Sequence, residues 1–263
     1  MSNIVSLRER DPNRVMFICD FTPPRGSDAS LLENDLDIPS DVISVAYNPG
    51  KSVRVSSALA AHWIQTNTKL DVMFTIATRD MNKIAIESFL LGSALLGLEN
   101  LVIVKGDQFR PAELSLVKPV DDFKPTELIK AVTSMNDGLD FKGGSLRSKT
   151  NFCIGATIDL GLGLHSQVRL TRYKILAGAQ FFLMQAVFEP KLIKQFHELY
   201  QDAYGQELST PIFYGLQVIT VESLVFCDVP DWINKDLETG RPPTEIASEA
   251  LNTFVESGFK SIY

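Results

Sequence analysis

Polar side chains stand at the ends of several apolar segments, where they could take part in chemistry. One apolar run ends at Asp20 and is followed by the stiff segment "TPPRG" (22–26). Later runs end close to Asp107 and Gln185. A carboxylate at the end of an apolar strand is partly desolvated, which raises its pKa and lets it donate a proton near neutral pH. Asp20 is therefore a candidate general acid.

Simpler interpretations remain open for these polar positions. Polar residues mark the place where any strand reaches the surface, and Asp20 could cap the turn that follows it. In "TRDMN" (78–82), Asp80 lies near the start of a helical segment, where an acid can cap the helix. Residue types alone do not decide between a chemical role and a capping role.

Eight short apolar runs predict the strands that would position these side chains. The runs are nearly continuous rather than alternating, which is typical of parallel strands covered on both faces. They span residues 14–21, 41–47, 71–78, 100–106, 151–157, 180–185, 211–216 and 259–263. The last run ends with the sequence itself, which indicates either a very short eighth strand or a tail beyond it.

Segments with helical periodicity lie between the expected strands. They span residues 53–67, 81–97, 124–135, 165–177, 190–202 and 244–258. This alternation favours a single-domain (β/α)8 barrel over residues 1–263, with an open doubly wound sheet as the alternative. Residues 1–13 are expected to form a flexible N-terminal arm. In such a barrel the site lies at the carboxyl ends of the strands, so the polar strand ends should converge.

The composition argues against several classes of protein. The chain has 263 residues, a net charge of −7 and a pI of about 5.1, with no basic stripe for nucleic-acid phosphates. Three cysteines without a CxxC pair are typical of free thiols in a reducing compartment. The first residues lack the apolar core of a signal peptide, and no apolar stretch approaches the roughly 20 residues that cross a membrane. We expect a cytoplasmic protein that binds neither nucleic acid nor membrane.

The remaining short motifs do not predict a metal or nucleotide site. The three histidines, His62, His165 and His197, lie on expected helices at no spacing that suits a metal ion. The fragment "GLG" (161–163) lacks the rest of a dinucleotide fingerprint. We therefore expect no metal.

The order of the strand ends resembles that of the methylenetetrahydrofolate reductase family. The resemblance covers residues 14–263 and rests on several blocks in sequence. These blocks are "DFTPPRG" (20–26), "ISVAYNPGKSVRVSSALA" (43–60), "ATRDMNKIAIESFLLGSALLGLENLVIVKGD" (77–107), "FCIGAT" (152–157), "RYKILAGAQFFLMQAVFE" (172–189) and the closing region that starts at "VPDWINKD" (229–236). The family's members are (β/α)8 barrels, which agrees with the fold expected from the pattern.

The resemblance implies an activity and a set of residues that bind the folate. The family reduces 5,10-methylenetetrahydrofolate to 5-methyltetrahydrofolate, with FAD as the bound hydride carrier and NADH or NADPH as the donor. Asp20 matches the family's general acid, Asp107 its pterin-contacting acid and Gln185 its folate-contacting glutamine. Barrels of this family often associate through outer helices, so a homo-oligomer is expected.

The resemblance also implies positions that contact the flavin. Lys174 matches a lysine that meets the flavin's phosphates or ribityl chain, and Tyr47 falls in the turn near the cofactor. The other cofactor positions carry residues that differ from the family's usual ones: Thr75, Lys105, Thr157 and Gln167.

These departures leave three hypotheses. Asp20 stands where the family has glutamate, which shortens the reach of the acid by roughly 1 Å, a displacement that can cost about 10²-fold in rate. The first hypothesis is a flavin-dependent reductase with substituted contacts. The second is direct hydride transfer from NADH to the folate without flavin, and the third is a non-catalytic barrel that binds folate or a protein partner.

Overall fold

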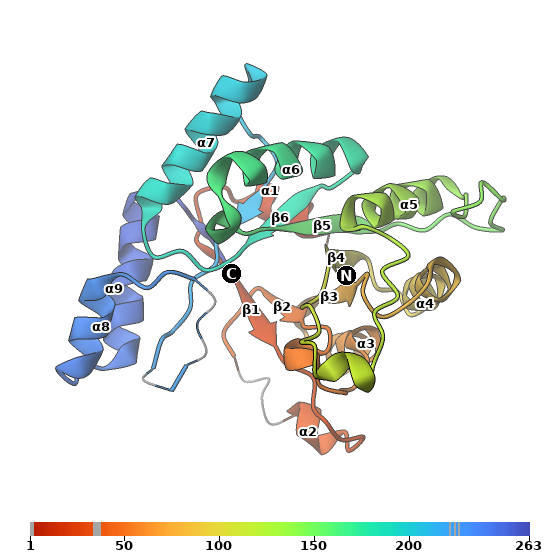
Figure 1. Cartoon of the computed structure of the whole chain (residues 1–263), viewed down its shortest axis with the longest axis horizontal. Helices are drawn as coiled ribbons and strands as arrows, with labels where there is room; N and C mark the ends of the chain where they lie inside the picture. Colours follow the sequence, from red (N-terminus) through yellow and green to blue (C-terminus); the bar gives the residue numbers. More distant parts are fainter. Residues whose placement is uncertain (1–2, 34–37, 221, 224, 226) are drawn as a thin grey trace.

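The computed structural model describes residues 3–33, 38–220, 222–223, 225 and 227–263 (Figure 1). Within these ranges eight parallel strands form one sheet in the order β7-β6-β5-β4-β3-β2-β1-β8. The strands are β1 (Met16–Phe21), β2 (Val42–Val45), β3 (Asp71–Ala77), β4 (Asn100–Val104), β5 (Cys153–Ile158), β6 (Phe181–Met184), β7 (Ile212–Phe213) and β8 (Ser261–Ile262). Each of the eight predicted runs overlaps one of these strands, and seven contain theirs whole; β5 extends one residue beyond the run 151–157.

The two ends of the sheet meet and close it into a barrel. Tyr214, directly after β7, pairs in parallel with Ile262 of β8. The Tyr214 N–H donates to the carbonyl oxygen of Ser261 at 2.8 Å. This closure confirms the predicted (β/α)8 barrel and excludes the open doubly wound sheet.

Helices surround the barrel, and six of them correspond to predicted segments (Figure 1). The six are α3 (Ser57–Asn67), α4 (Lys83–Leu95), α5 (Pro125–Asp137), α6 (Leu164–Ala177), α7 (Pro190–Tyr204) and α9 (Pro243–Glu256). Three of them begin at a proline, which suits the first helical position because its missing N–H would be unpaired there anyway. The structure adds α2 (Ser30–Glu33), α8 (Asp231–Glu238) and the 3-10 turns η1 (Pro49–Lys51), η2 (Glu113–Ser115) and η3 (Leu160–Leu162).

The segment expected to be an N-terminal arm contains a further helix, α1 (Ile4–Arg10). Its first residue, Ile4, is fully buried among the side chains that fill the barrel interior. The Ile4 N–H donates to Oδ1 of Asn100 at 3.0 Å, and the Asn100 amide in turn donates to the carbonyl of Val72. Residues of α1 therefore pack against the amino ends of β3 and β4.

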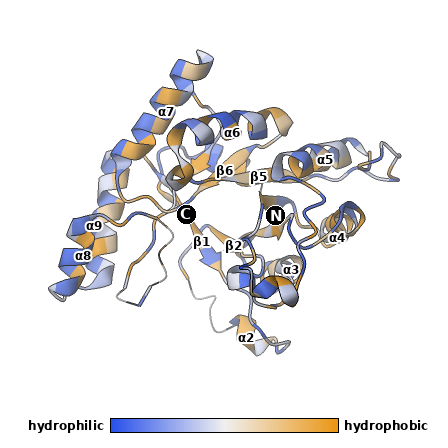
Figure 2. Ribbon diagram, in the orientation of Figure 1, coloured by the Kyte–Doolittle hydropathy of each residue, from blue (hydrophilic) through white to orange (hydrophobic). Residues whose placement is uncertain are grey.

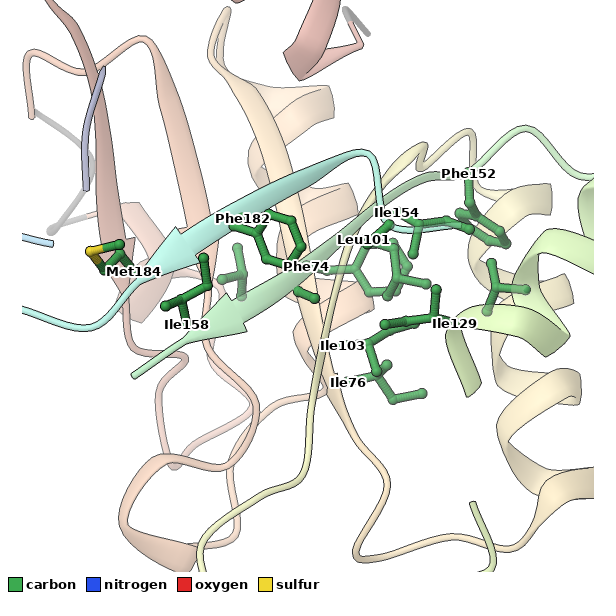
Figure 3. Close-up of a cluster of buried hydrophobic side chains, with 14 of the residues drawn as sticks. Phe74, Ile76, Leu101, Ile103, Ile129, Phe152, Ile154, Ile158, Phe182 and Met184 are labelled. Atoms are coloured by element: carbon green, nitrogen blue, oxygen red, sulfur yellow. The ribbon is translucent and has the colours of Figure 1, made fainter. Parts of the chain in front are cut away.

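The strands are apolar on both faces because two separate clusters pack against them. The inner cluster fills the barrel and includes Met73, Val102 and Phe181. The outer cluster lies between strands and helices and includes Phe74 and Leu101 (Figure 3). Hydrophobic residues accordingly dominate β5 and β6, whereas helices such as α7 carry both kinds (Figure 2). Buried strands of this kind read as continuous apolar runs in the sequence.

Alternation along the strands identifies the side chains that face the carboxyl end of the barrel interior. Successive side chains of a strand point to opposite faces. Ile18 and Leu183 belong to the inner cluster, so Asp20 and Gln185, two residues further on, face the same interior. The same alternation brings Ser44, Thr75, Thr157 and Tyr263 to this end of the barrel.

Candidate functional site

A cavity of about 590 Å³ opens at the carboxyl end of the barrel between β1, β6, the segment after β7, β8 and α9. Asp20, Gln185 and Tyr263 all line it. The expected convergence of Asp20 and Gln185 is thus present in the structure. Much of the remaining wall is apolar and comes from Leu216, Val218, Ala247 and Leu251, among others. We call this space the mouth cavity.

Gly215 brings β7 close enough to β6 to form one wall of the mouth cavity. A Cβ atom at Gly215 would lie 2.4 Å from the carbonyl oxygen of Met184 and 2.7 Å from the backbone nitrogen of Ala186. Both atoms belong to rigid backbone, so any side chain at this position would push the segments apart. Glycine here therefore preserves the position of the neighbouring Gln185.

Asp20 is the acid of the mouth cavity, and its surroundings favour its neutral form. Asp20 is exposed to water at the cavity, although many protein atoms lie around its carboxyl group. Desolvation depends on all surrounding atoms, so their effect outweighs the exposure to water. Burial raises the pKa of Asp20 to about 6, against the opposing effect of hydrogen bonds from Tyr263 and Ser44. An acid with this pKa holds its proton much closer to neutrality than an ordinary aspartate.

The loop after Asp20 is tied to the segment that follows β2. Arg54 donates from Nη1 to the carbonyl oxygen of Pro23 at 2.9 Å. The N–H of Val55 donates to the carbonyl of Pro24 at 3.0 Å. Two prolines and two long-range hydrogen bonds therefore fix the backbone that leaves the acid.

Tyr263 and Ser44 contact Asp20, and sequence reasoning did not identify either of them. Tyr263 donates its hydroxyl to Oδ1 of Asp20 at 3.3 Å. Ser44 lies opposite Asp20 in the register of β1 and β2 and is buried. The signal for Tyr263 was its place in "FKSIY", two residues after Ser261, because alternation puts both on one face of the last strand.

Asp107 lies apart from the residues that line the mouth cavity. It lines a smaller hollow of about 200 Å³ with Arg79 and Lys105. Arg79 donates to the Asp107 backbone carbonyl at 2.7 Å and lies over the Phe109 ring at 4.4 Å. The Asp107 side chain itself is exposed. The structure therefore does not bring Asp107 to the same cavity as Asp20 and Gln185.

The segment "TRDMN" (78–82) forms an ion pair rather than a cap at its aspartate. Arg79 binds Asp80 through two nitrogens, at 2.6 and 2.7 Å. The cap of α4 is Asn82, whose Oδ1 accepts the Ala85 N–H at 2.9 Å. The segment therefore does cap α4, but the capping residue is Asn82 and not Asp80.

The cofactor positions on β2, β3 and β4 lie on different parts of this end of the barrel. Tyr47 follows β2 and interacts with Asp80. The pKa of Tyr47 is raised to about 12, mainly by burial and to a smaller extent by the nearby Asp80 carboxylate. Thr75 lies within β3 and is half-buried. Lys105 is exposed beside Asp107.

The cofactor positions on β5 and α6 are engaged with the protein itself. Lys174 of α6 donates to the carbonyl oxygen of Thr157 at 2.5 Å, and desolvation lowers the pKa of this lysine to about 8. Gln167 is 4% exposed, and its Oε1 accepts the N–H of Asp159 at 3.2 Å. A flavin's phosphates and ribityl chain need donors that are open to a ligand, whereas Gln167 is buried and Lys174 is held against the Thr157 backbone.

One cysteine and two histidines have structural surroundings. Cys153 is buried in the barrel interior, where desolvation raises its pKa to about 11. His62 contacts the carbonyl oxygen of Leu96, and His197 contacts the Tyr214 hydroxyl, each at 3.1 Å. Among the described residues, no group of three or more metal-ligating side chains could hold a metal ion. In the same part of the chain, no helix is long and apolar enough to cross a membrane.

Fold and site together define a class: (β/α)8 barrels with an acid at the carboxyl end of the first strand. The chain belongs to the methylenetetrahydrofolate reductase family, whose model matches residues 7–257. This family is one of oxidoreductases. No curated protein sequence matches the chain.

Solved structures share the barrel at low sequence identity. An uncharacterized protein from Clostridium thermocellum, described as binding two copies of 5-methyl-5,6,7,8-tetrahydrofolic acid, matches with a TM-score of 0.69 and 12% identity. The match covers 97% of this chain and 90% of that protein. Oxaloacetate acetylhydrolase matches with a TM-score of 0.54 and 11% identity, over 97% of this chain and 84% of its own. At such identities the likeness shows the fold alone.

Proposed function

We propose that the chain binds a reduced folate in the mouth cavity and reduces the methylene group that the folate carries to a methyl group. The observation that carries the proposal is the meeting of Asp20 and Gln185 in one cavity of about 590 Å³, with the pKa of Asp20 raised to about 6. A largely apolar wall with a few polar groups suits a pterin and its aromatic tail. The family membership supports the same substrate class.

In the proposed reaction Asp20 supplies the proton. Neutral Asp20 protonates an amine of 5,10-methylenetetrahydrofolate, and the bridging carbon–nitrogen bond breaks to leave an iminium. A hydride from NADH or NADPH then adds to the methylene carbon and gives 5-methyltetrahydrofolate and the oxidised nicotinamide. Asp20 recovers a proton from water, so one hydride and one proton are consumed in each turnover. Gln185, which lines the same cavity, would orient the pterin by hydrogen bonds.

For the hydride donor we favour direct transfer from the nicotinamide over transfer through FAD. The support is the burial of Gln167, which is 4% exposed, and the hydrogen bond that holds Lys174 against the Thr157 carbonyl. An absorbance spectrum checks this preference. Protein that oxidises NADH with methylenetetrahydrofolate while showing no flavin bands, with or without added FAD, supports direct transfer. Flavin bands that bleach with NADH and return with folate would contradict it.

A non-catalytic folate-binding barrel is the second candidate. The Clostridium thermocellum protein, similar in fold over 97% of this chain, is described only as binding a methylated folate. The two candidates differ in a turnover assay that follows nicotinamide oxidation and 5-methyltetrahydrofolate formation together. Stoichiometric formation of both products supports the reductase. Saturable folate binding without product, with NADH and with NADPH, would support the binding protein instead.

A further inference from the structure

Two polar side chains, from the regions of the two strands that flank β1, meet at the Asp20 carboxyl group. Tyr263, at the end of β8, donates its hydroxyl to Oδ1 of Asp20 at 3.3 Å. Ser44 of β2 is 1% exposed, and its hydroxyl interacts with both Asp20 and Tyr263. Because β2 and β8 lie on either side of β1, the two partners contact the same acid from its two sides.

We propose that Tyr263, assisted by Ser44, is a positioning residue that fixes the Asp20 carboxyl in its proton-donating orientation. This proposal rests on the proposed function, because it concerns the acid that serves that reaction. Tyr263 is well suited to hold a neighbour, because its own backbone is fixed in the seam that closes the barrel. The Leu216 N–H donates to the Tyr263 carbonyl at 2.7 Å, and the Tyr263 N–H donates to the Tyr214 carbonyl at 2.9 Å.

The direction of the tyrosine hydrogen bond decides which oxygen carries the acid proton. A phenol O–H that donates to Oδ1 needs an accepting lone pair, which the carbonyl oxygen of a neutral carboxylic acid offers best. The proton of neutral Asp20 therefore resides on Oδ2. Tyr263 fixes this position without gaining or losing a proton itself. A fixed proton matters because misplacement by about 1 Å can cost roughly 10²-fold in rate.

The other groups around Asp20 are neutral near pH 7. Burial raises the pKa of Tyr263 and, on β1 itself, the pKa of Cys19. Gln185 lines the same cavity from β6 and carries no charge. Two hydroxyl donors, from Tyr263 and Ser44, are thus the groups that stabilise the ionised form of Asp20. Removing either donor should raise the pKa of this acid further, because hydrogen bonds to the charged form favour that form.

The test compares three variants of the full chain. Tyr263→Phe keeps the ring and the backbone seam and removes only the hydroxyl. We expect kcat to fall about 10-fold or more with little change in KM for the folate. The descending limb of kcat against pH should also move to higher pH, and Ser44→Ala should move it in the same direction. Tyr214→Phe is the matched control, since it removes a buried hydroxyl from the same seam that contacts His197 instead; its kcat and pH midpoint should stay at the wild-type values.

A second measurement separates this proposal from the proposed function. The ¹³C resonance of the Asp20 carboxyl, assigned by its loss in Asp20→Asn, reports the titration of the acid without any turnover. The midpoint should rise in Tyr263→Phe and stay unchanged in Tyr214→Phe. If the wild-type protein fails to reduce folate, the proposed function is wrong and this midpoint still decides whether Tyr263 holds Asp20. A midpoint in Tyr263→Phe equal to that of the wild type would overturn the proposal, whether or not the protein turns over folate.

Discussion

The ammonium nitrogen of Lys174 on α6 lies 2.5 Å from the carbonyl oxygen of Thr157 at the end of β5. Sequence resemblance assigns both residues to a flavin, yet here they bind each other. Desolvation lowers the pKa of Lys174 to about 8. Lys174 therefore helps to join α6 to β5. Its effect on the free energy of unfolding can be measured.

The Lys174→Met variant should show how this lysine affects folding. The folded pKa is lowered from 10.5 to about 8, so between these pH values the unfolded chain binds more protons than the folded one. The stability of the wild type should therefore rise relative to Lys174→Met as the pH goes from 8 to 10. Urea unfolding of both proteins at pH 7.5 and pH 9.5 gives the comparison. An equal difference at both pH values would show that Lys174 is not desolvated.

The Asp20→Asn variant should change the pH dependence of stability in the opposite direction. The folded pKa of Asp20 is raised from 3.8 to about 6, so the folded chain binds more protons between these values. The wild type should lose stability relative to Asp20→Asn as the pH rises from 4 to 6, with no further change above about pH 7. Thermal melting across this range provides the test. Parallel melting profiles for the two proteins would place Asp20 in a water-like environment.

The Gly215→Ala variant should damage the wall of the mouth cavity. The added methyl group would meet the backbone of Met184 and Ala186 at distances below 3 Å. Overpacking of this kind typically costs about 1–3 kcal/mol, and the folate affinity should fall with the displaced wall. Gly92→Ala is the matched control, because a Cβ atom there meets no atom within 4 Å and alanine favours a helix. Equal stability of both variants would mean that β6 and β7 do not need this close approach.

Gln185 and Asp107 should differ in their effect on folate binding. Gln185 lines the mouth cavity, whereas Asp107 lines a separate hollow beside Arg79. We expect Gln185→Ala to weaken folate binding about 10-fold, or roughly 1.4 kcal/mol. Asp107→Ala should change the affinity much less. Titration calorimetry with a reduced folate measures both, and an equal loss in Asp107→Ala would place Asp107 at the bound folate, as the resemblance implies.

Sequence patterns were sufficient for the barrel because its strands are buried on both faces. Runs such as 71–78 carry apolar residues on both faces, since Met73 faces the interior and Phe74 faces the helices. The short helix α1 was not predicted, because one buried side chain, Ile4, and one hydrogen bond to Asn100 dock it. Helix α8 was missed as well, since a helix of eight residues offers little periodicity to detect.

Site residues could be predicted from the sequence only where a side chain capable of chemistry stands at the end of an expected strand. Asp20 and Gln185 end long apolar runs, and alternation along the strand brings both to the mouth cavity. Ser44 looks like an ordinary strand residue, because its importance comes from its register opposite Asp20. The engagement of Lys174 with Thr157 depends on how α6 packs on β5, which no local pattern contains.

The most direct test of the account is the pH dependence of 5-methyltetrahydrofolate formation by the wild type and by Asp20→Asn. The account predicts that the wild type forms this product from methylenetetrahydrofolate and NADH or NADPH. Its kcat should decline above about pH 6 as Asp20 loses its proton. Asp20→Asn should lose about 10²-fold or more in kcat, because general acids contribute on that order. Unchanged turnover in Asp20→Asn, or the absence of product from the wild type at every pH, would contradict the assignment of Asp20 as the acid of a folate reductase.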